Sequence, residues 1–189
     1  MNKQAQIELN RLLEGNKNFL NGTPVAENKC LATLQSLATR QEPGAIVLSC
    51  SDSRVVPEII FDVGIGELFV VRTAGIGVGP NIIESIEFGV QKLKIPLLVL
   101  IGHDDCGVMK YAQENYPNPL EDYYALMNSV YPVLGDKDLT SDDIAKKHTH
   151  FTKKVLLKRS YIIREAYEKH QLDIVETHFN FHTGEIELL

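Results

Sequence analysis

The 189-residue sequence has no tryptophan, only three cysteines and no long apolar run. Three cysteines cannot build the disulfide framework of a small secreted protein, which needs many paired cysteines. Their scarcity indicates a reducing compartment, so we expect a cytoplasmic protein. The longest apolar run covers residues 95–101, far short of the roughly 20 residues that cross a bilayer. The first 20 residues also lack the unbroken apolar segment of a secretory signal.

An excess of positive charge is missing as well. The formal net charge is −6, which argues against a nucleic-acid or anionic-membrane partner. Hydrophobic residues make up 44% and charged residues 23%, as in compact folded proteins. The length predicts a single domain over residues 1–189. Within it we distinguish an N-terminal helical arm (1–40), a core (41–113) and a region of helices and edge strands (114–189).

Alternating strand and helix patterns predict an α/β fold. Short apolar runs are typical of strands buried on both faces, and helices between them indicate a mostly parallel central sheet flanked by helices. Strands are expected at 45–49, 68–72 and 97–101, and helices at 1–20, 32–39, 80–93 and 123–130, with a loop over 115–122. Ser141-Asp142-Asp143 predicts the cap of one long helix running to about residue 170. The segments 174–181 and 185–188 predict a hairpin at the sheet edge.

Metal-ligating side chains follow two of the predicted strands. Cys50 follows the first strand directly, His103 follows the third, and Cys106 comes three residues later. Ligands bind at the carboxyl ends of the strands in open α/β sheets, so these side chains are expected to meet. Two thiolates and one imidazole suit Zn²⁺, and a fourth position left for water is typical of a catalytic site. The alternative is that both cysteines are ordinary core residues and His103 a hydrogen-bonded loop residue.

Asp52 and Arg54 form a second candidate pair beside Cys50. Asp52 is close enough in sequence to reach a metal or its water, and Arg54 can hold the carboxylate through two hydrogen bonds. The alternative is a helix-capping aspartate with a surface ion pair. Next to a metal ligand, a held carboxylate is more useful as a group that orients the metal-bound nucleophile.

Four segments within roughly residues 41–110 resemble the β-class carbonic anhydrases and occur in the same order along the chain. They are Cys50-Ser-Asp-Ser-Arg54, Glu67-Leu-Phe-Val-Val-Arg-Thr-Ala-Gly75, Ser85-Ile-Glu-Phe88 and Gly102-His-Asp-Asp-Cys-Gly107. The N-terminal helix and the final hairpin match more weakly.

The resemblance implies a zinc enzyme that reversibly hydrates CO₂ to bicarbonate and a proton by attack of zinc-bound hydroxide. It implies one Zn²⁺ per chain, held by Cys50, His103 and Cys106, and a homodimer or a dimer of dimers. Asp52 and Arg54 form the catalytic dyad, and in a closed form Asp52 becomes the fourth zinc ligand. The residues implied to bind substrate are Gln41, across the dimer interface, together with Phe69, Ala74, Phe88 and Gly107.

Several positions depart from the family pattern. Phe88 stands where many members have tyrosine, Ile76 where asparagine is frequent, and Glu176 where glycine is common. Val47 replaces the tryptophan that helps form a regulatory bicarbonate site near Arg72 in some bacterial members. We therefore expect that form of inhibition to be absent.

The remaining glycine, histidine and cysteine signals are better explained by structural roles than by further binding sites. The glycines of Gly75-Ile-Gly-Val-Gly79 precede a predicted helix, but the segment lacks a phosphate-loop pattern and is expected to pack tightly near the zinc pocket. His148, His150, His178 and His182 are expected at the surface or an interface, and Cys30 as a buried or partly exposed free thiol. Two alternative functions remain: hydrolysis of COS or CS₂ at the same zinc, and a zinc-binding relative without turnover.

Overall fold

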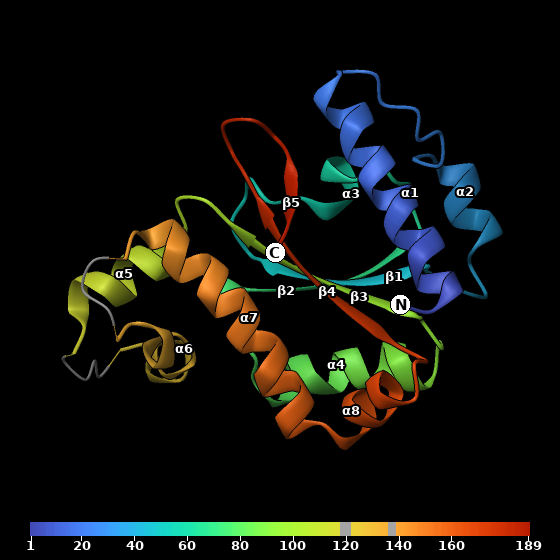
Figure 1. Ribbon diagram of the computed structural model, residues 1–189. Helices are drawn as coiled ribbons and strands as arrows, with labels where there is room; N and C mark the ends of the chain where they lie inside the picture. Colours follow the sequence, from blue (N-terminus) through green and yellow to red (C-terminus); the bar gives the residue numbers. More distant parts are fainter. Residues whose placement is uncertain (118–121, 136–138) are drawn as a thin grey trace.

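The computed structural model describes residues 1–117, 122–135 and 139–189, and its centre is a five-stranded sheet (Figure 1). The strand order is β2 (Leu68–Thr73), β1 (Ala45–Cys50), β3 (Leu97–His103), β4 (Asp173–Phe179) and β5 (Ile186–Leu188). The first four strands run parallel, and only β5 is antiparallel to its neighbour β4. The mostly parallel sheet and the edge hairpin predicted from the sequence are both confirmed.

Helices cover both faces of the sheet, and for this reason every residue of β1 and β3 is buried. On one face Ile46 and Leu48 pack with α4 (Pro80–Gln91), α7 (Ser141–Arg159) and α8 (Tyr161–Glu168). On the other face Ala45 and Val47 pack with α1 (Lys3–Leu20) and α3 (Pro57–Ile60). Successive strand residues point to opposite faces, which explains why one uninterrupted apolar run serves two cores.

The predicted long helix from Ser141 to about residue 170 is wrong in one respect. It is divided at Ser160, whose backbone is extended (φ −112°, ψ 118°). The Ser160 hydroxyl donates to Glu87 Oε1 (2.6 Å) and accepts the Ile163 N–H (3.0 Å), so it caps α8 and ties it to α4. Thr140, rather than Ser141, caps α7, and it forms a capping box with Asp143.

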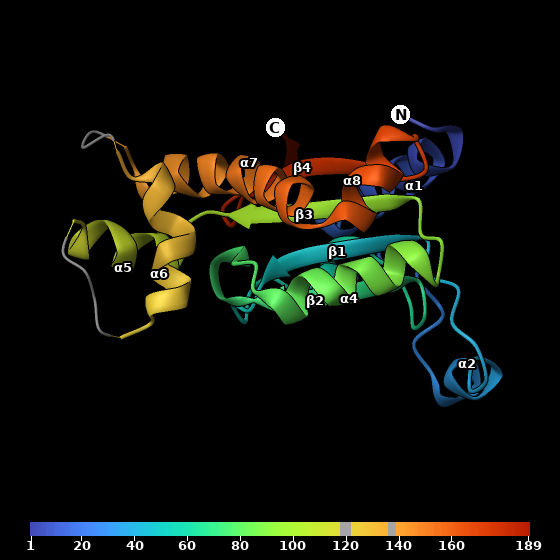
Figure 2. The same cartoon turned by 90° about the horizontal axis from the view of Figure 1, so that it is seen from below.

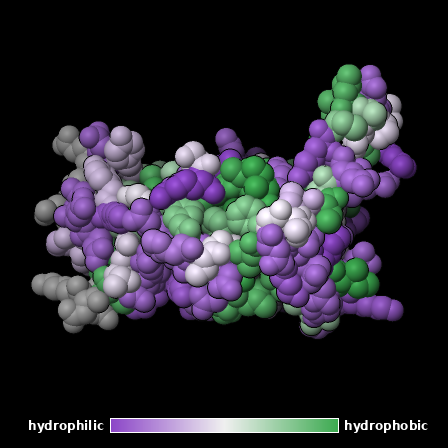
Figure 3. Space-filling model, turned by 90° about the horizontal axis from the view of Figure 1, so that it is seen from above, coloured by the Kyte–Doolittle hydropathy of each residue, from purple (hydrophilic) through white to green (hydrophobic). Residues whose placement is uncertain are grey.

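The N-terminal arm has two unequal parts. α1 is capped by Asn2 and buries one side against the sheet. α2 (Leu31–Ser36) has no buried residue and stands off the body of the molecule (Figure 2). Its Leu31 and Leu34 are exposed, and apolar side chains gather on this projection in Figure 3. The two predicted helices of residues 1–40 are thus confirmed, the second ending three residues early.

Short helices gather at the carboxyl ends of the strands. The 3₁₀ turn η1 (Ala74–Ile76) follows β2, and α5 (Gly107–Asn115) follows β3. Beyond them lie α6 (Tyr124–Val130), as predicted, and the 3₁₀ turn η2 (Tyr131–Val133) (Figures 1 and 2). Of the loop predicted over 115–122, residues 118–121 lie outside the described part of the chain. No helix among the described residues has the length and apolar character needed to span a membrane.

Candidate metal centre

Three ligand side chains converge where β1 and β3 end. Cys50 is the last residue of β1, His103 is the last residue of β3, and Cys106 immediately precedes α5. Because the two strands are neighbours and parallel, their carboxyl ends deliver these residues to one place. All three are buried, and their ligand atoms lie within 4.8 Å of one another. The juxtaposition predicted from the sequence is confirmed.

The surroundings of the two cysteines shift their thiol pKa values in opposite directions. Backbone N–H groups of Asp52 (3.4 Å) and Gly75 (3.3 Å) point at the Cys50 sulfur. A hydrogen bond from Cys106, together with those from the two amides, lowers the pKa of Cys50 to about 4 despite burial. The same hydrogen bond, together with burial, raises the pKa of Cys106. Cys50 is thus the more readily ionised sulfur of the two, and a bound metal ion would displace the protons of both thiols.

His103 presents its free nitrogen to the two sulfurs. Its Nδ1 lies 2.7 Å from the Asp104 carbonyl, which can only accept, so Nδ1 carries the hydrogen. Nε2 is buried and has no hydrogen-bond partner among the residues that the structure describes. A histidine held at one nitrogen by a carbonyl, with the other free, is the usual state of a metal-ligating imidazole. Two sulfurs and this nitrogen therefore fit Zn²⁺.

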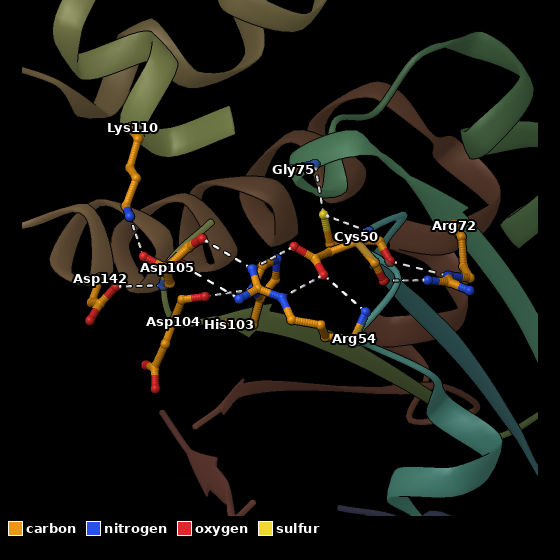
Figure 4. A network of polar contacts seen from close by, with 10 residues as sticks. Cys50, Arg54, Arg72, Gly75, His103, Asp104, Asp105, Lys110 and Asp142 are labelled. Carbon is orange, nitrogen blue, oxygen red and sulfur yellow. Dashed lines mark hydrogen bonds and ion pairs between the residues drawn. The ribbon is translucent and has the colours of Figure 1, made fainter. Parts of the chain in front are cut away.

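Gly75 is needed for this arrangement. Its φ of +58° favours glycine, and a Cβ there would lie 2.8 Å from Cγ1 of Val108. The conformation directs the Gly75 N–H to the Cys50 sulfur (Figure 4). The prediction that the glycine-rich segment packs tightly near the metal pocket is confirmed at this residue.

Asp52 and Arg54 form the predicted pair beside the cluster. The Arg54 side chain donates through Nε to Asp52 Oδ1 (3.0 Å) and through Nη2 to Oδ2 (2.9 Å), and the Arg54 N–H donates to Oδ1 as well (2.9 Å). These bonds hold the pKa of Asp52 far below its usual range and raise the pKa of Arg54. The Asp52 carboxylate is bound by Arg54 here, and the closed form, with Asp52 as a metal ligand, stays a prediction.

Further polar residues surround the cluster, and the sequence had given none of them a role in holding it. Arg72 donates to the carbonyls of Cys50 (3.1 Å) and Asp52 (2.7 Å), which fixes the loop that follows β1 (Figure 4). Asp105 accepts from Lys110 and lies 3.4 Å from Nη1 of Arg54. Arg72 could have been found from its place near the carboxyl end of a strand next to Cys50, but Lys110 carries no such signal.

The implied substrate residues separate into two groups. Ala74 and Gly107 directly follow β2 and Cys106, so they lie beside the cluster. Phe69 pairs with Ile46, four residues before the Thr73–Cys50 pair, which places it about 13 Å back along the strand. It stacks on Phe88, and the ring centroids are 6.4 Å apart.

Gln41 precedes β1 by four residues, at the opposite end of the sheet from Cys50. Phe88 is 48% exposed at the surface of α4. One chain therefore does not bring Gln41, Phe69 and Phe88 to its own metal cluster.

Three minor expectations need correction or completion. His148 and His178 are buried rather than superficial, because each has a polar partner: the Ser129 carbonyl at 2.9 Å and Asp104 at 2.7 Å. Cys30 is exposed, at the start of the projecting α2. Glu176, which stands where the family commonly has glycine, has polar partners for its carboxylate: Lys153 at 2.9 Å and His150 at 2.8 Å.

Comparisons with known proteins identify relatives of the chain. Residues 45–186 match the family model described as carbonic anhydrase. Carbonic anhydrase 2 of Mycobacterium tuberculosis is 37% identical over 180 residues, covering 92% of this chain and 87% of the relative. The carbonic anhydrase of Mycolicibacterium smegmatis is 36% identical over 184 residues, covering 94% of this chain and 89% of that protein.

Solved structures show the same fold. A tetrameric β-carbonic anhydrase of the ascomycete Sordaria macrospora superposes with a TM-score of 0.69 at 26% identity, covering 97% of this chain and 94% of that one. The Coccomyxa β-carbonic anhydrase, solved with acetazolamide, gives 0.69 at 25% identity, with coverages of 97% and 84%. From the buried Cys-His-Cys cluster, the family model and these relatives, we conclude that the chain belongs to the β-carbonic anhydrases, a family of enzymes.

Proposed function

We propose that the protein catalyses the reversible hydration of CO₂ to bicarbonate with one Zn²⁺ per chain held by Cys50, His103 and Cys106. The observation that carries the proposal is the buried cluster of these three ligands beside a carboxylate bound by two guanidinium nitrogens. A zinc ion in such a site supplies a water of lowered pKa that acts as a nucleophile near neutral pH.

Asp52 orients the attacking oxygen rather than removing its proton. Its carboxylate stays ionised across the working pH range, because Arg54 holds its pKa far below neutrality. An ionised carboxylate accepts a hydrogen bond, and a fixed acceptor turns the lone pair of the attacking oxygen toward the carbon of CO₂. The bidentate geometry leaves little rotational freedom to the carboxylate. An inert zinc-binding relative would have no use for this dyad.

A second copy of the chain completes the substrate pocket in this proposal. Gln41, Phe69 and Phe88 are far from their own cluster, yet the family pattern makes all three pocket residues. In a two-fold dimer the contacts are reciprocal, so if these residues of one chain lie at the partner's site, the partner's equivalents lie at the site of the first chain. We infer a homodimer or a dimer of dimers. The two free thiols at the site fit a reducing compartment such as the cytoplasm.

Stopped-flow CO₂ hydration on protein of measured zinc content tests the activity directly. Wild type with one zinc per chain should hydrate CO₂ rapidly, Cys106→Ser should lose zinc, and Asp52→Ala should keep zinc and lose most of the turnover. Zinc-loaded wild type without hydration activity would refute the proposal. Running COS and CS₂ in parallel distinguishes the alternative substrates.

Mixing two inactive variants tests the shared pocket. When Gln41→Ala and Asp52→Ala chains are unfolded together and refolded, half of the random dimers are mixed, and each mixed dimer has one intact site. The mixture should recover about a quarter of wild-type activity, as two-fold symmetry requires. A mixture no more active than its components would show that Gln41 acts within its own chain.

A further inference from the structure

Phe181, at the tip of the β4–β5 hairpin, contacts both parts of the candidate site. The guanidinium carbon of Arg54 lies 4.1 Å from the centre of the Phe181 ring. The same ring lies 5.0 Å from the His103 imidazole, centroid to centroid. A residue 127 positions from Arg54 in the chain thus touches the dyad arginine and the metal-ligating histidine together.

The β4–β5 hairpin is fixed to the turn that follows His103 through the buried carboxylate of Asp104. Asp104 Oδ1 lies 2.7 Å from His178 Nε2, and Oδ2 accepts the Phe181 N–H at 3.1 Å. Asp104 also provides the carbonyl that binds His103 Nδ1 (Figure 4). The backbone of Phe181 is therefore held against the residue next to His103, so its ring has a defined position relative to the cluster.

Arg54 lies between two carboxylates and binds both, so its orientation depends on what else holds the guanidinium. Its side chain is 49% exposed, and Asp105 Oδ2 lies 3.4 Å from Nη1 while Asp52 binds Nε and Nη2. Holding a long exposed side chain in one ion-pair geometry costs rotational entropy, so an exposed pair gains from a contact that restricts the side chain. A guanidinium lying over an aromatic face keeps its edge available for in-plane hydrogen bonds, here those to Asp52.

We propose that Phe181 is a positioning residue of the CO₂-hydrating site: its ring holds the Arg54 guanidinium in the plane that binds Asp52 and prevents its transfer to Asp105. The inference deepens the proposed function and depends on it for its kinetic consequences. The contact itself is a property of the folded chain. The ring acts through Arg54, and Arg54 acts through the Asp52 carboxylate.

The kinetic test replaces the ring by an apolar side chain without a π face. Phe181→Leu, with full zinc content, should lower kcat for CO₂ hydration about tenfold and leave KM within twofold, as expected for loss of a cation–π contact on a residue that acts in the transition state. Phe181→Tyr keeps the ring face and should retain activity within twofold. Phe151→Leu, which removes another half-buried ring from α7, is the matched control and should also stay within twofold.

A double variant separates positioning from simple packing. If Arg54 moves to Asp105 when the ring is lost, Asp105→Asn in the Phe181→Leu background should restore at least half of the lost activity. A packing defect would not be rescued by this change. Failure of the rescue, or equal kcat values for Phe181→Leu and Phe151→Leu, would overturn the proposal. Phe181→Met replaces the leucine variant if that protein does not fold.

A measurement that does not depend on turnover tests the contact between Phe181 and Arg54 separately from the proposed CO₂ hydration. The Nε–H of Arg54 lies near the ring, so its proton resonance in a ¹⁵N-arginine spectrum should be shifted upfield by the ring current. Phe181→Leu should abolish this shift and Phe151→Leu should preserve it, and an unchanged resonance in Phe181→Leu would refute the contact. If zinc-loaded wild type does not hydrate CO₂, the proposed function fails while this resonance still reports on Arg54.

Discussion

Asn16 connects three parts of the fold through one buried side chain. It lies on α1 and is 5% exposed. Its amide donates to the carbonyls of Ile60 (3.2 Å) and Gly184 (3.0 Å), and its oxygen accepts the Ile186 N–H (3.0 Å). The last two partners belong to the β4–β5 hairpin, which carries Phe181, so this residue links the N-terminal arm to the support of the candidate site.

Asn16→Ala should therefore be strongly destabilising. The change leaves three backbone groups without their hydrogen-bond partner. Each costs roughly 1 kcal/mol, the lower end of the usual range, because the bonds to Gly184 and Ile186 are only partly buried and water can replace them in part. The expected loss is about 3 kcal/mol of unfolding free energy. For a chain of this size that corresponds to a fall of roughly 6–12 °C in Tm.

Thermal unfolding of zinc-loaded protein at one fixed protein concentration measures this loss, because metal binding and oligomerisation both change the apparent stability. Asn10→Ala is the matched control. Asn10 lies on the exposed side of the same helix and accepts one hydrogen bond from Gln6, so its change should alter the free energy by less than about 0.5 kcal/mol. Equal Tm values for the two variants would refute the reasoning.

Three further predictions concern the cysteines, a buried histidine and a glycine. In the native zinc-loaded protein one thiol per chain should react quickly with a disulfide reagent, because Cys30 is exposed and the Thr33 hydroxyl lowers its pKa; Cys30→Ser should remove this reaction without changing activity, and two fast thiols would contradict it. Burial lowers the pKa of His148 from 6.5 to about 4, so the folded state favours the neutral ring. The unfolding free energy is therefore unaffected by His148 above pH 6.5 and decreases by about 3 kcal/mol as the pH falls from 6.5 toward 4, where the unfolded chain binds a proton that the folded chain does not. His148→Gln should flatten this part of the curve of stability against pH, and parallel curves for the variant and wild type would exclude the assignment. Gly75→Ala should weaken zinc binding roughly tenfold in a chelator competition, because the new Cβ meets Val108 and displaces the N–H from Cys50, whereas Gly79→Ala, whose Cβ has open space, should bind zinc like wild type.

The cluster of candidate metal ligands could be found before the fold was known because its signals are local. Each of the strands β1 and β3 is a continuous apolar run, and a cysteine or histidine at its end needs no long-range information to be noticed. Parallel pairing then brings strand ends together as a rule of the fold class. The same reasoning could not divide the helix after Ser141, because the break at Ser160 depends on Glu87, which lies 73 residues earlier.

The sequence by itself therefore determined the α/β class, the strands, the Cys50-His103-Cys106 cluster and its dyad, since apolar periodicity and strand-end residues are properties of short segments. Only the tertiary structure decided what surrounds that cluster. Arg72 and His178 lie on two strands, Asp104 in the turn after β3 and Phe181 at a hairpin tip, and their contacts join residues between 1 and 127 positions apart. The tertiary structure also showed that Gln41, Phe69 and Phe88 lie away from their own cluster. Such contacts depend on how the elements pack in three dimensions, and the pattern of a short segment does not encode that packing.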